Sequence, residues 1–109
     1  TAAPGFYEEL DRKGARLQHG LEAIFSAAEV PLTINRVGSM MTLFFNPGPV
    51  TGWSSVERSD KAGFGKFFHR MLDEGVYLPP SAFEAMFVSA AHSNEDIDAT
   101  VEAAGRVLA

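Results

Sequence analysis

The most distinctive carboxylate of this 109-residue chain is Glu84, which stands in the apolar stretch Phe83-Glu84-Ala85-Met86-Phe87. A short distance before it, Pro79-Pro80 restricts the backbone and removes two hydrogen-bond donors. A carboxylate in such surroundings either points from a sheet into solvent or faces a cavity. Composition alone favours solvent. The aromatic neighbours and the rigid turn strengthen the functional alternative, because a functional side chain needs rigid supports.

The three histidines do not form a metal-binding pattern. His19 and His69 lie on separate predicted helices, and no spacing typical of metal ligands links them. His92 directly precedes a predicted helix cap, where a local hydrogen bond is its ordinary role. We therefore predict no metal site.

The lysines and serines give no sign of a nucleophile. All three lysines (Lys13, Lys61 and Lys66) have polar neighbours on predicted helices, unlike a desolvated Schiff-base lysine. The glycine-containing sequence Gly63–Lys66 lies inside a helical stripe and does not form a phosphate-binding loop. Three serines lack a visible neighbouring base, which argues against serine catalysis: Ser39, Ser81 and Ser89.

Composition narrows the class of protein. Apolar residues make up 46% of the chain and nine residues are Phe, which predicts one globular domain. The net charge of -5, with acids and bases interspersed, argues against a nucleic-acid partner. No apolar run approaches the roughly 20 residues of a membrane span, and no signal peptide is visible. The absence of cysteine excludes disulfides and thiolate chemistry and fits a reducing compartment.

Apolar spacing predicts a first helix of about six turns, which starts near Pro4 and ends before Pro31. Gly14 falls in its apolar stripe, which indicates a close contact there. The other stripe residues recur at helical spacing: Phe6, Leu10, Leu17, Leu21, Ile24 and Ala28.

Two further helices are predicted. The second begins at a cap residue, Ser59 or Asp60, and ends at Gly75. Its stripe contains Phe64, Phe67, Phe68, Met71 and Leu72. The third begins at a capping box, Ser93–Asp96, with Asp in place of the usual Glu or Gln. Its stripe contains Ile97, Val101, Ala104 and Leu108.

Three strands complete the predicted fold. Leu32–Val37 and Met40–Phe45 form a hairpin around the turn Gly38-Ser39, and Phe83–Ser89 is the third strand. The second strand is apolar on both faces, so it should be central or covered on both sides. The order α-β-β-α-β-α predicts an α+β fold, with a small, mainly antiparallel three-stranded sheet covered by helices on one face.

Several specific stretches, spread over essentially the whole chain, share one resemblance: Gly5–Leu10, Asn35–Met40 with Phe44-Phe45, Phe67-Phe68-His69, Leu72–Ala85, and Ala91-His92-Ser93 with Asp96-Ile97. They resemble the C-terminal region of the glutamate-1-semialdehyde 2,1-aminomutases, which are fold-type I pyridoxal-phosphate enzymes near the class III aminotransferases. The resemblance implies that residues 1–109 are a single C-terminal small domain. It also implies that the large domain, with the Schiff-base lysine and the phosphate cradle, lies upstream.

The resemblance implies conversion of glutamate 1-semialdehyde to 5-aminolevulinate, the precursor of haem and chlorophyll, by a cytoplasmic homodimer. The cofactor would be pyridoxal or pyridoxamine 5'-phosphate held by the large domain, so this domain alone should be inactive. Two alternatives stay open. One is a domain of a class III aminotransferase, although many of these carry Arg where this chain has Glu84. The other is a free-standing α+β binding module.

The resemblance also assigns site residues. Glu84 matches the Glu that approaches cofactor and substrate from the small domain, and Ser81 and Ser39 are further candidates for lining the substrate cavity. Met86 is a departure, because many relatives have Gly after the Glu-Ala pair. A bulkier side chain puts the local strand geometry in doubt.

Overall fold

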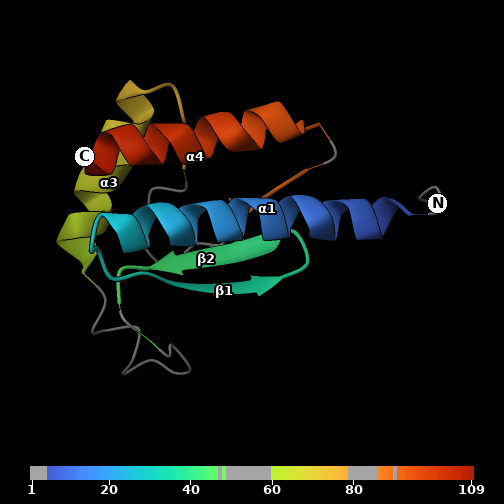
Figure 1. The fold of residues 1–109 in the computed structure, drawn as a ribbon, viewed down its shortest axis with the longest axis horizontal. Helices are drawn as coiled ribbons and strands as arrows, with labels where there is room; N and C mark the ends of the chain where they lie inside the picture. Colours follow the sequence, from blue (N-terminus) through green and yellow to red (C-terminus); the bar gives the residue numbers. More distant parts are fainter. Residues whose placement is uncertain (1–4, 47, 49–59, 79–85, 90) are drawn as a thin grey trace.

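A computed structural model of the chain describes residues 5–46, 48, 60–78, 86–89 and 91–109 (Figure 1). The elements follow the predicted order, and their bounds are α1 (Phe6–Ala27), β1 (Thr33–Val37), β2 (Met40–Phe44), α3 (Lys61–Asp73), β3 (Met86–Phe87) and α4 (Asn94–Leu108). In Figure 1, α1 lies over one face of the sheet, and α4 lies on the side of α1 away from the sheet. The predicted α+β class is confirmed.

The sheet is antiparallel in the described residues, with the strand order β1-β2-β3. β1 and β2 pair from Thr33↔Phe44 to Val37↔Met40, around the predicted turn at Gly38-Ser39. β2 is therefore central, as its composition predicts. On the face opposite α1, Met40 is 38% exposed, whereas Phe44 is only 7% exposed.

The third strand as predicted, Phe83–Ser89, is not confirmed. The structure has only the two-residue strand Met86–Phe87 in this region, paired with Met41 and Met40. Val88 and Ser89 follow without strand pairing, and Phe83–Ala85 lies outside the described residues. Met86, Phe87 and Val88 are all apolar, so apolar character alone could not show that the strand ends at Phe87.

Helix α1 has 22 residues and buries Gly14, Leu17, Leu21 and Phe25. Phe25 is absent from the predicted stripe although it is only 1% exposed. It lies four residues after Leu21, so it shares a helix face with that residue. Phe6, at the opposite end of the helix, is partly exposed because the N-terminal turns of α1 extend beyond the sheet and α4 (Figure 1).

The predicted helix ends are confirmed for α3 and α4. Asp60 caps α3, since its Oδ1 accepts a hydrogen bond from the Gly63 amide at 2.8 Å. Ser93 caps α4 as part of the predicted capping box. Gly75 follows α3 with φ +86°, a left-handed conformation that glycine adopts without strain. These caps satisfy backbone groups that a helix end leaves without a partner.

The core centres on aromatic rings where α1, α3 and the end of β2 meet. The ring of Phe25 lies 5.3 Å from those of both Phe45 and Phe67, in edge-on geometry. Phe64 adds a ring 5.8 Å from that of Phe45. Such pairs contribute about 0.5–1.5 kcal/mol each beyond the area they bury. This cluster holds the sheet and the two helices as one body.

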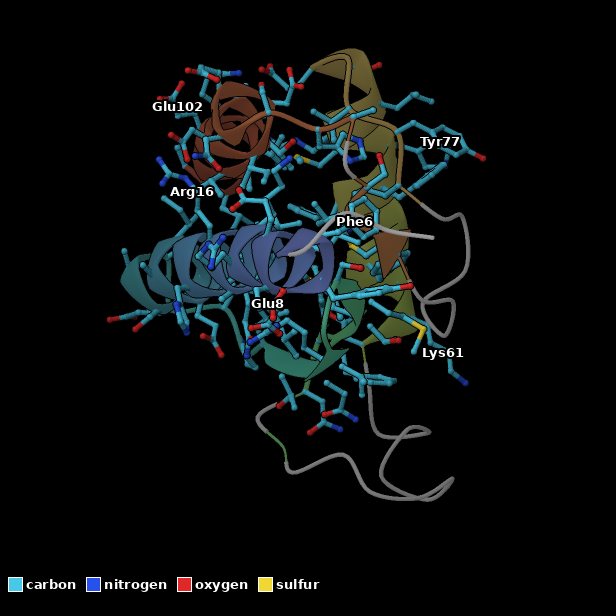
Figure 2. The ribbon with its side chains drawn as sticks, turned by 90° about the vertical axis from the view of Figure 1, so that its right-hand side faces the viewer. Phe6, Glu8, Arg16, Lys61, Tyr77 and Glu102 are labelled. Atoms are coloured by element: carbon cyan, nitrogen blue, oxygen red, sulfur yellow. The ribbon has the colours of Figure 1, made fainter. Side chains whose placement is uncertain are left out.

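Helix α4 packs along α1 through small residues and an ion pair. Ala104 is fully buried, and a Cβ at Gly20 would collide with the side chain of Val101. The Arg16 guanidinium donates to both carboxylate oxygens of Asp98, at 2.8 and 2.7 Å. Figure 2 shows Arg16 on the side of α1 that faces α4. Within the described residues, no helix is long and apolar enough to span a membrane.

Candidate functional site

The structure describes one of the three predicted site residues. Ser39 is half-buried in the turn between β1 and β2. Glu84 and Ser81 lie outside the described residues, so their roles stay predictions. The site is therefore built here from the elements that flank them in sequence.

Ser39 lies directly beside the chain segment that follows Glu84. The carbonyl oxygen of Ser39 accepts a hydrogen bond from the amide of Val88 at 2.9 Å. The next residue, Met40, pairs with Phe87. β3 begins two residues after Glu84. The turn and the segment 86–88 thus form one hydrogen-bonded unit, which begins two residues after Glu84 in the sequence.

The turn is also fixed against α1. Gly14 of α1 faces the carbonyl oxygen of Gly38 so closely that a Cβ at position 14 would overlap it. The close contact predicted at Gly14 is confirmed. An ordinary side chain here would push the turn away from the helix.

Arg36 also holds this turn. Its Nη1 donates to the carbonyl oxygen of Gly38 at 2.6 Å and to Oδ1 of Asp11 at 3.0 Å. Its Nε donates to Oε1 of Gln18 at 2.6 Å. The Arg36 side chain is 20% exposed, whereas that of Asp11 is 59% exposed. One guanidinium therefore joins two positions of α1 to the backbone of the turn.

A cavity of about 790 Å³ lies between α4 and the segments that flank Glu84. Its lining includes Tyr77 and Leu78 on one flank, Val88 on the other, and Ile97 of α4. Leu78, Val88 and Ile97 are buried, and Tyr77 is largely exposed in Figure 2. The lining thus combines buried apolar side chains with the exposed Tyr77.

Charged residues also line this cavity, namely Glu74, Asp96 and Arg106. Arg106 Nε donates to Oε1 of Glu74 at 2.7 Å, which joins α4 to the end of α3. Asp96 belongs to the capping box: Oδ2 accepts from the Ser93 amide at 2.9 Å, and Ser93 Oγ accepts from the Asp96 amide at 3.0 Å. The hydrogen bond from the Ser93 amide, followed by the Ser93 side-chain contact, lowers the pKa of Asp96.

His92 also lines the cavity, and its predicted local hydrogen bond is confirmed. Nδ1 accepts from the Ser89 amide at 2.9 Å. That contact leaves no proton on Nδ1, so the neutral ring would carry its proton on Nε2. His92 thus stabilises the connection between β3 and α4.

No lysine lines the cavity within the described residues. Lys61 and Lys66 are exposed on α3, and Lys13 lies on α1. Among the same residues, no three His, Asp or Glu side chains group closely enough to hold a metal ion. The described part of the chain therefore offers supports for a site and no covalent anchor for a cofactor.

The chain is similar in sequence to curated proteins of known name. It is 52% identical over 107 residues to the glutamate-1-semialdehyde 2,1-aminomutase of Myxococcus xanthus, which covers 98% of this chain and 25% of that protein. It is 48% identical over 105 residues to the protein of the same name from Thermus thermophilus, covering 96% of this chain and 25% of the relative. Over nearly all of its residues, the chain is similar to part of the glutamate-1-semialdehyde 2,1-aminomutases. It spans about one quarter of the length of the curated relatives it matches.

A solved structure shares the fold of this chain. The internal aldimine form, with pyridoxal phosphate, of the FumI protein from Sphingopyxis sp. MTA144 superposes with a TM-score of 0.73 at 29% identity. The match covers 95% of this chain and 22% of that one. No protein-family model matches the chain.

Arg36 is the residue of this site that sequence reasoning missed. It belongs to Asn35–Met40, one of the stretches that resemble the aminomutase family. The sequence does contain a sign of its role. Arg36 lies two residues after Ile34 on a predicted strand, so this cation shares a face of the strand with an apolar residue. That face is turned toward α1, since Arg36 reaches Asp11 and Gln18. A lone cation on a covered sheet face must find partners there.

Proposed function

We propose that residues 1–109 form the small domain of an enzyme that isomerises glutamate 1-semialdehyde to 5-aminolevulinate. The observation that supports this most directly is the identity to two glutamate-1-semialdehyde 2,1-aminomutases, which is 48% and 52% over nearly the whole chain. The fold supports it as well, through its likeness to the pyridoxal-phosphate form of another protein.

The cofactor, pyridoxal or pyridoxamine 5'-phosphate, would serve as carrier of the amino group and as electron sink. The described residues do not fit as its holding site, because none of the lysines lines the cavity and each lies on a helix surface. The upstream large domain of the full-length enzyme would hold it. This domain's contribution is then to shape one wall of the site.

Glu84 is the residue that we propose for contact with cofactor and substrate. A carboxylate at this place repels the α-carboxylate of an ordinary amino acid, which would disfavour simple transamination. Ser39 and Ser81 are the proposed lining residues on either side. Ser39 has the firmer basis, because its backbone is bonded to the segment that follows Glu84.

The proposed contact with the large domain is the end of the sheet near Val37 and Met40, on the face opposite α1. Val37 is 75% exposed on this face and Met40 is 38% exposed, although α1 covers the opposite face. Apolar side chains in this position indicate a partner surface. We also propose that the full-length enzyme is a cytoplasmic homodimer. The isolated domain should self-associate, and a sedimentation profile of monomers at high concentration would contradict the assignment of this face.

The test of the proposed function is to express the full-length gene and assay it with glutamate 1-semialdehyde. We expect a yellow or near-ultraviolet cofactor band and formation of 5-aminolevulinate without an external amino donor. An enzyme that needs an external amino acid and 2-oxo acid pair would instead be an aminotransferase. A colourless product of about this chain's length would indicate a binding module.

A further inference from the structure

The turn Gly38-Ser39 is held more tightly than hairpin closure requires. Its Gly38 carbonyl lies against Gly14 of α1 and accepts from Arg36, and its Ser39 carbonyl accepts from Val88. Three parts of the chain therefore meet at two consecutive peptide groups: α1 through Gly14, β1 through Arg36, and the segment after β3 through Val88. A simple hairpin needs only the pairing of β1 with β2.

The centre of this arrangement is the Arg36 network, defined as Arg36 with Asp11, Gln18 and the carbonyl group of Gly38. The contacts to Gln18 and Gly38 are both 2.6 Å, short for charge-assisted hydrogen bonds. The guanidinium is largely shielded from solvent, so salt and water weaken its contacts less than those of a surface pair. Its planar donors reach α1 and the turn at once, which a lysine ammonium cannot reproduce.

We propose that Arg36 is a positioning residue for the aminomutase reaction. Its network fixes the turn that carries Ser39. Through the bond from Val88 to Ser39, the same network holds the end of the described segment 86–88, which begins two residues after Glu84 in the sequence. This inference rests on the proposed function, because it assumes that Glu84 and Ser39 face the substrate. Arg36 itself contacts neither substrate nor cofactor in this scheme.

Two other arginines show what a purely structural ion pair looks like in this fold. Arg16 joins α1 to α4 through Asp98, and both side chains are about half exposed. Arg106 joins α4 to Glu74, also near the surface. Neither reaches the turn. Arg16 is therefore the matched control for Arg36, since it also lies between α1 and a neighbouring element and also forms two short bonds to its partners.

The main experiment compares Arg36→Gln with Arg16→Gln in the full-length holoenzyme. Arg36→Gln should lower kcat/KM for glutamate 1-semialdehyde by roughly ten- to a hundredfold, the scale of a site displaced by about 1 Å. The cofactor spectrum should be retained. Arg36→Lys should recover part of the loss, and Arg16→Gln should leave kcat/KM nearly unchanged. Equal effects of the Arg36→Gln and Arg16→Gln variants on kcat/KM would overturn the proposal.

A second readout does not depend on activity. Hydrogen exchange of peptides covering residues 33–44 and 86–89 should accelerate in Arg36→Gln and not in Arg16→Gln, because only the former frees the turn. If Arg36→Gln does not fold, Asp11→Asn tests the same network more mildly and should shift exchange and kcat/KM in the same direction. If hydrogen exchange of these peptides is unchanged in both Asp11→Asn and Arg36→Lys, the proposed positioning role of Arg36 is overturned. A wild-type enzyme that makes no 5-aminolevulinate would contradict the proposed function instead, and the exchange data alone would then decide whether Arg36 fixes the turn.

Discussion

Gly14 of α1 lies directly against the carbonyl oxygen of Gly38, in the turn between β1 and β2. The two residues are far apart in sequence, and their contact sets the distance between the helix and the end of the hairpin. Because the neighbour is a backbone oxygen held by Arg36, it cannot move aside as a flexible side chain would. The same turn carries Ser39, so this contact also sets one edge of the candidate site.

Gly14→Ala should therefore destabilise the protein, although alanine favours helices by about 0.5–1 kcal/mol over glycine. Overpacking against a fixed backbone atom costs about 1–3 kcal/mol, which outweighs that gain. Gly65→Ala in α3 is the control, because a Cβ there meets nothing within 4 Å. It should stabilise by about 0.4–1 kcal/mol. Denaturant unfolding of both variants measures the two changes, and a Gly14→Ala variant as stable as Gly65→Ala would contradict the contact.

Ser93→Ala should loosen the start of α4 by removing the acceptor for the Asp96 amide. Loss of such a cap costs about 1 kcal/mol of unfolding free energy. Ser93→Thr keeps an acceptor oxygen and should retain most of the stability. Asp60→Ala removes the cap of α3 and should have a similar cost. Hydrogen exchange would locate each loss in the first turn of its own helix, and a diffuse effect would argue against capping as the cause.

The local features of the fold were predictable from sequence. Helix caps and turns depend on a few neighbouring residues, so the sequence predicts Ser93 and Gly75 correctly. It leaves Ser59 or Asp60 as the cap of α3, and the structure has Asp60. The helical stripes were only partly right. Phe25, Ala103 and Val107 are buried without having been predicted, because a helix packed on two partners buries a wider face than one stripe.

The candidate site was less predictable, because its supports are distant in sequence. The sequence places Asp11 and Gln18 on a predicted helix and Arg36 on a predicted strand, with nothing to link them. Only the packing of β1 under α1 brings them together. The roles of Glu84 and Ser81 came from family resemblance, since no rule of spacing or composition distinguishes a site carboxylate from a solvated one.

The stability of the domain should fall at acidic pH. The hydrogen bond and charge of Arg16 lower the pKa of Asp98, and the Ser93 contacts lower that of Asp96. A carboxylate whose folded pKa is depressed adds stability above its unfolded pKa of about 4, and this is lost as pH falls through the folded value. Unfolding free energy should thus be level near neutral pH and decrease below about pH 4.

The unfolding free energy should fall less steeply with decreasing pH in Asp98→Asn, because this variant lacks the Asp98 carboxylate and its lowered pKa. Arg16→Gln should have the same effect on this slope, because it removes the main cause of the lowered pKa while leaving the carboxylate in place. High salt should weaken the contribution of this half-exposed pair in the wild type. Denaturant titrations at several pH values measure the slope, and slopes equal to wild type in both variants would rule out the pair as a source of acid sensitivity.

Glu84→Arg should change the reaction preference of the full-length enzyme. The proposed role of Glu84 is to repel the α-carboxylate of external substrates, and an Arg would instead bind that group through paired hydrogen bonds. We expect the rate of amino transfer to external 2-oxo acids to rise by roughly tenfold or more, which corresponds to about 1.4 kcal/mol of barrier. Formation of 5-aminolevulinate should fall in the same variant. Glu84→Gln is the control: it removes the repulsion without adding an attraction, so its gain should be smaller. A Glu84→Arg enzyme that is no faster with 2-oxo acids than wild type would show that this carboxylate does not govern substrate choice.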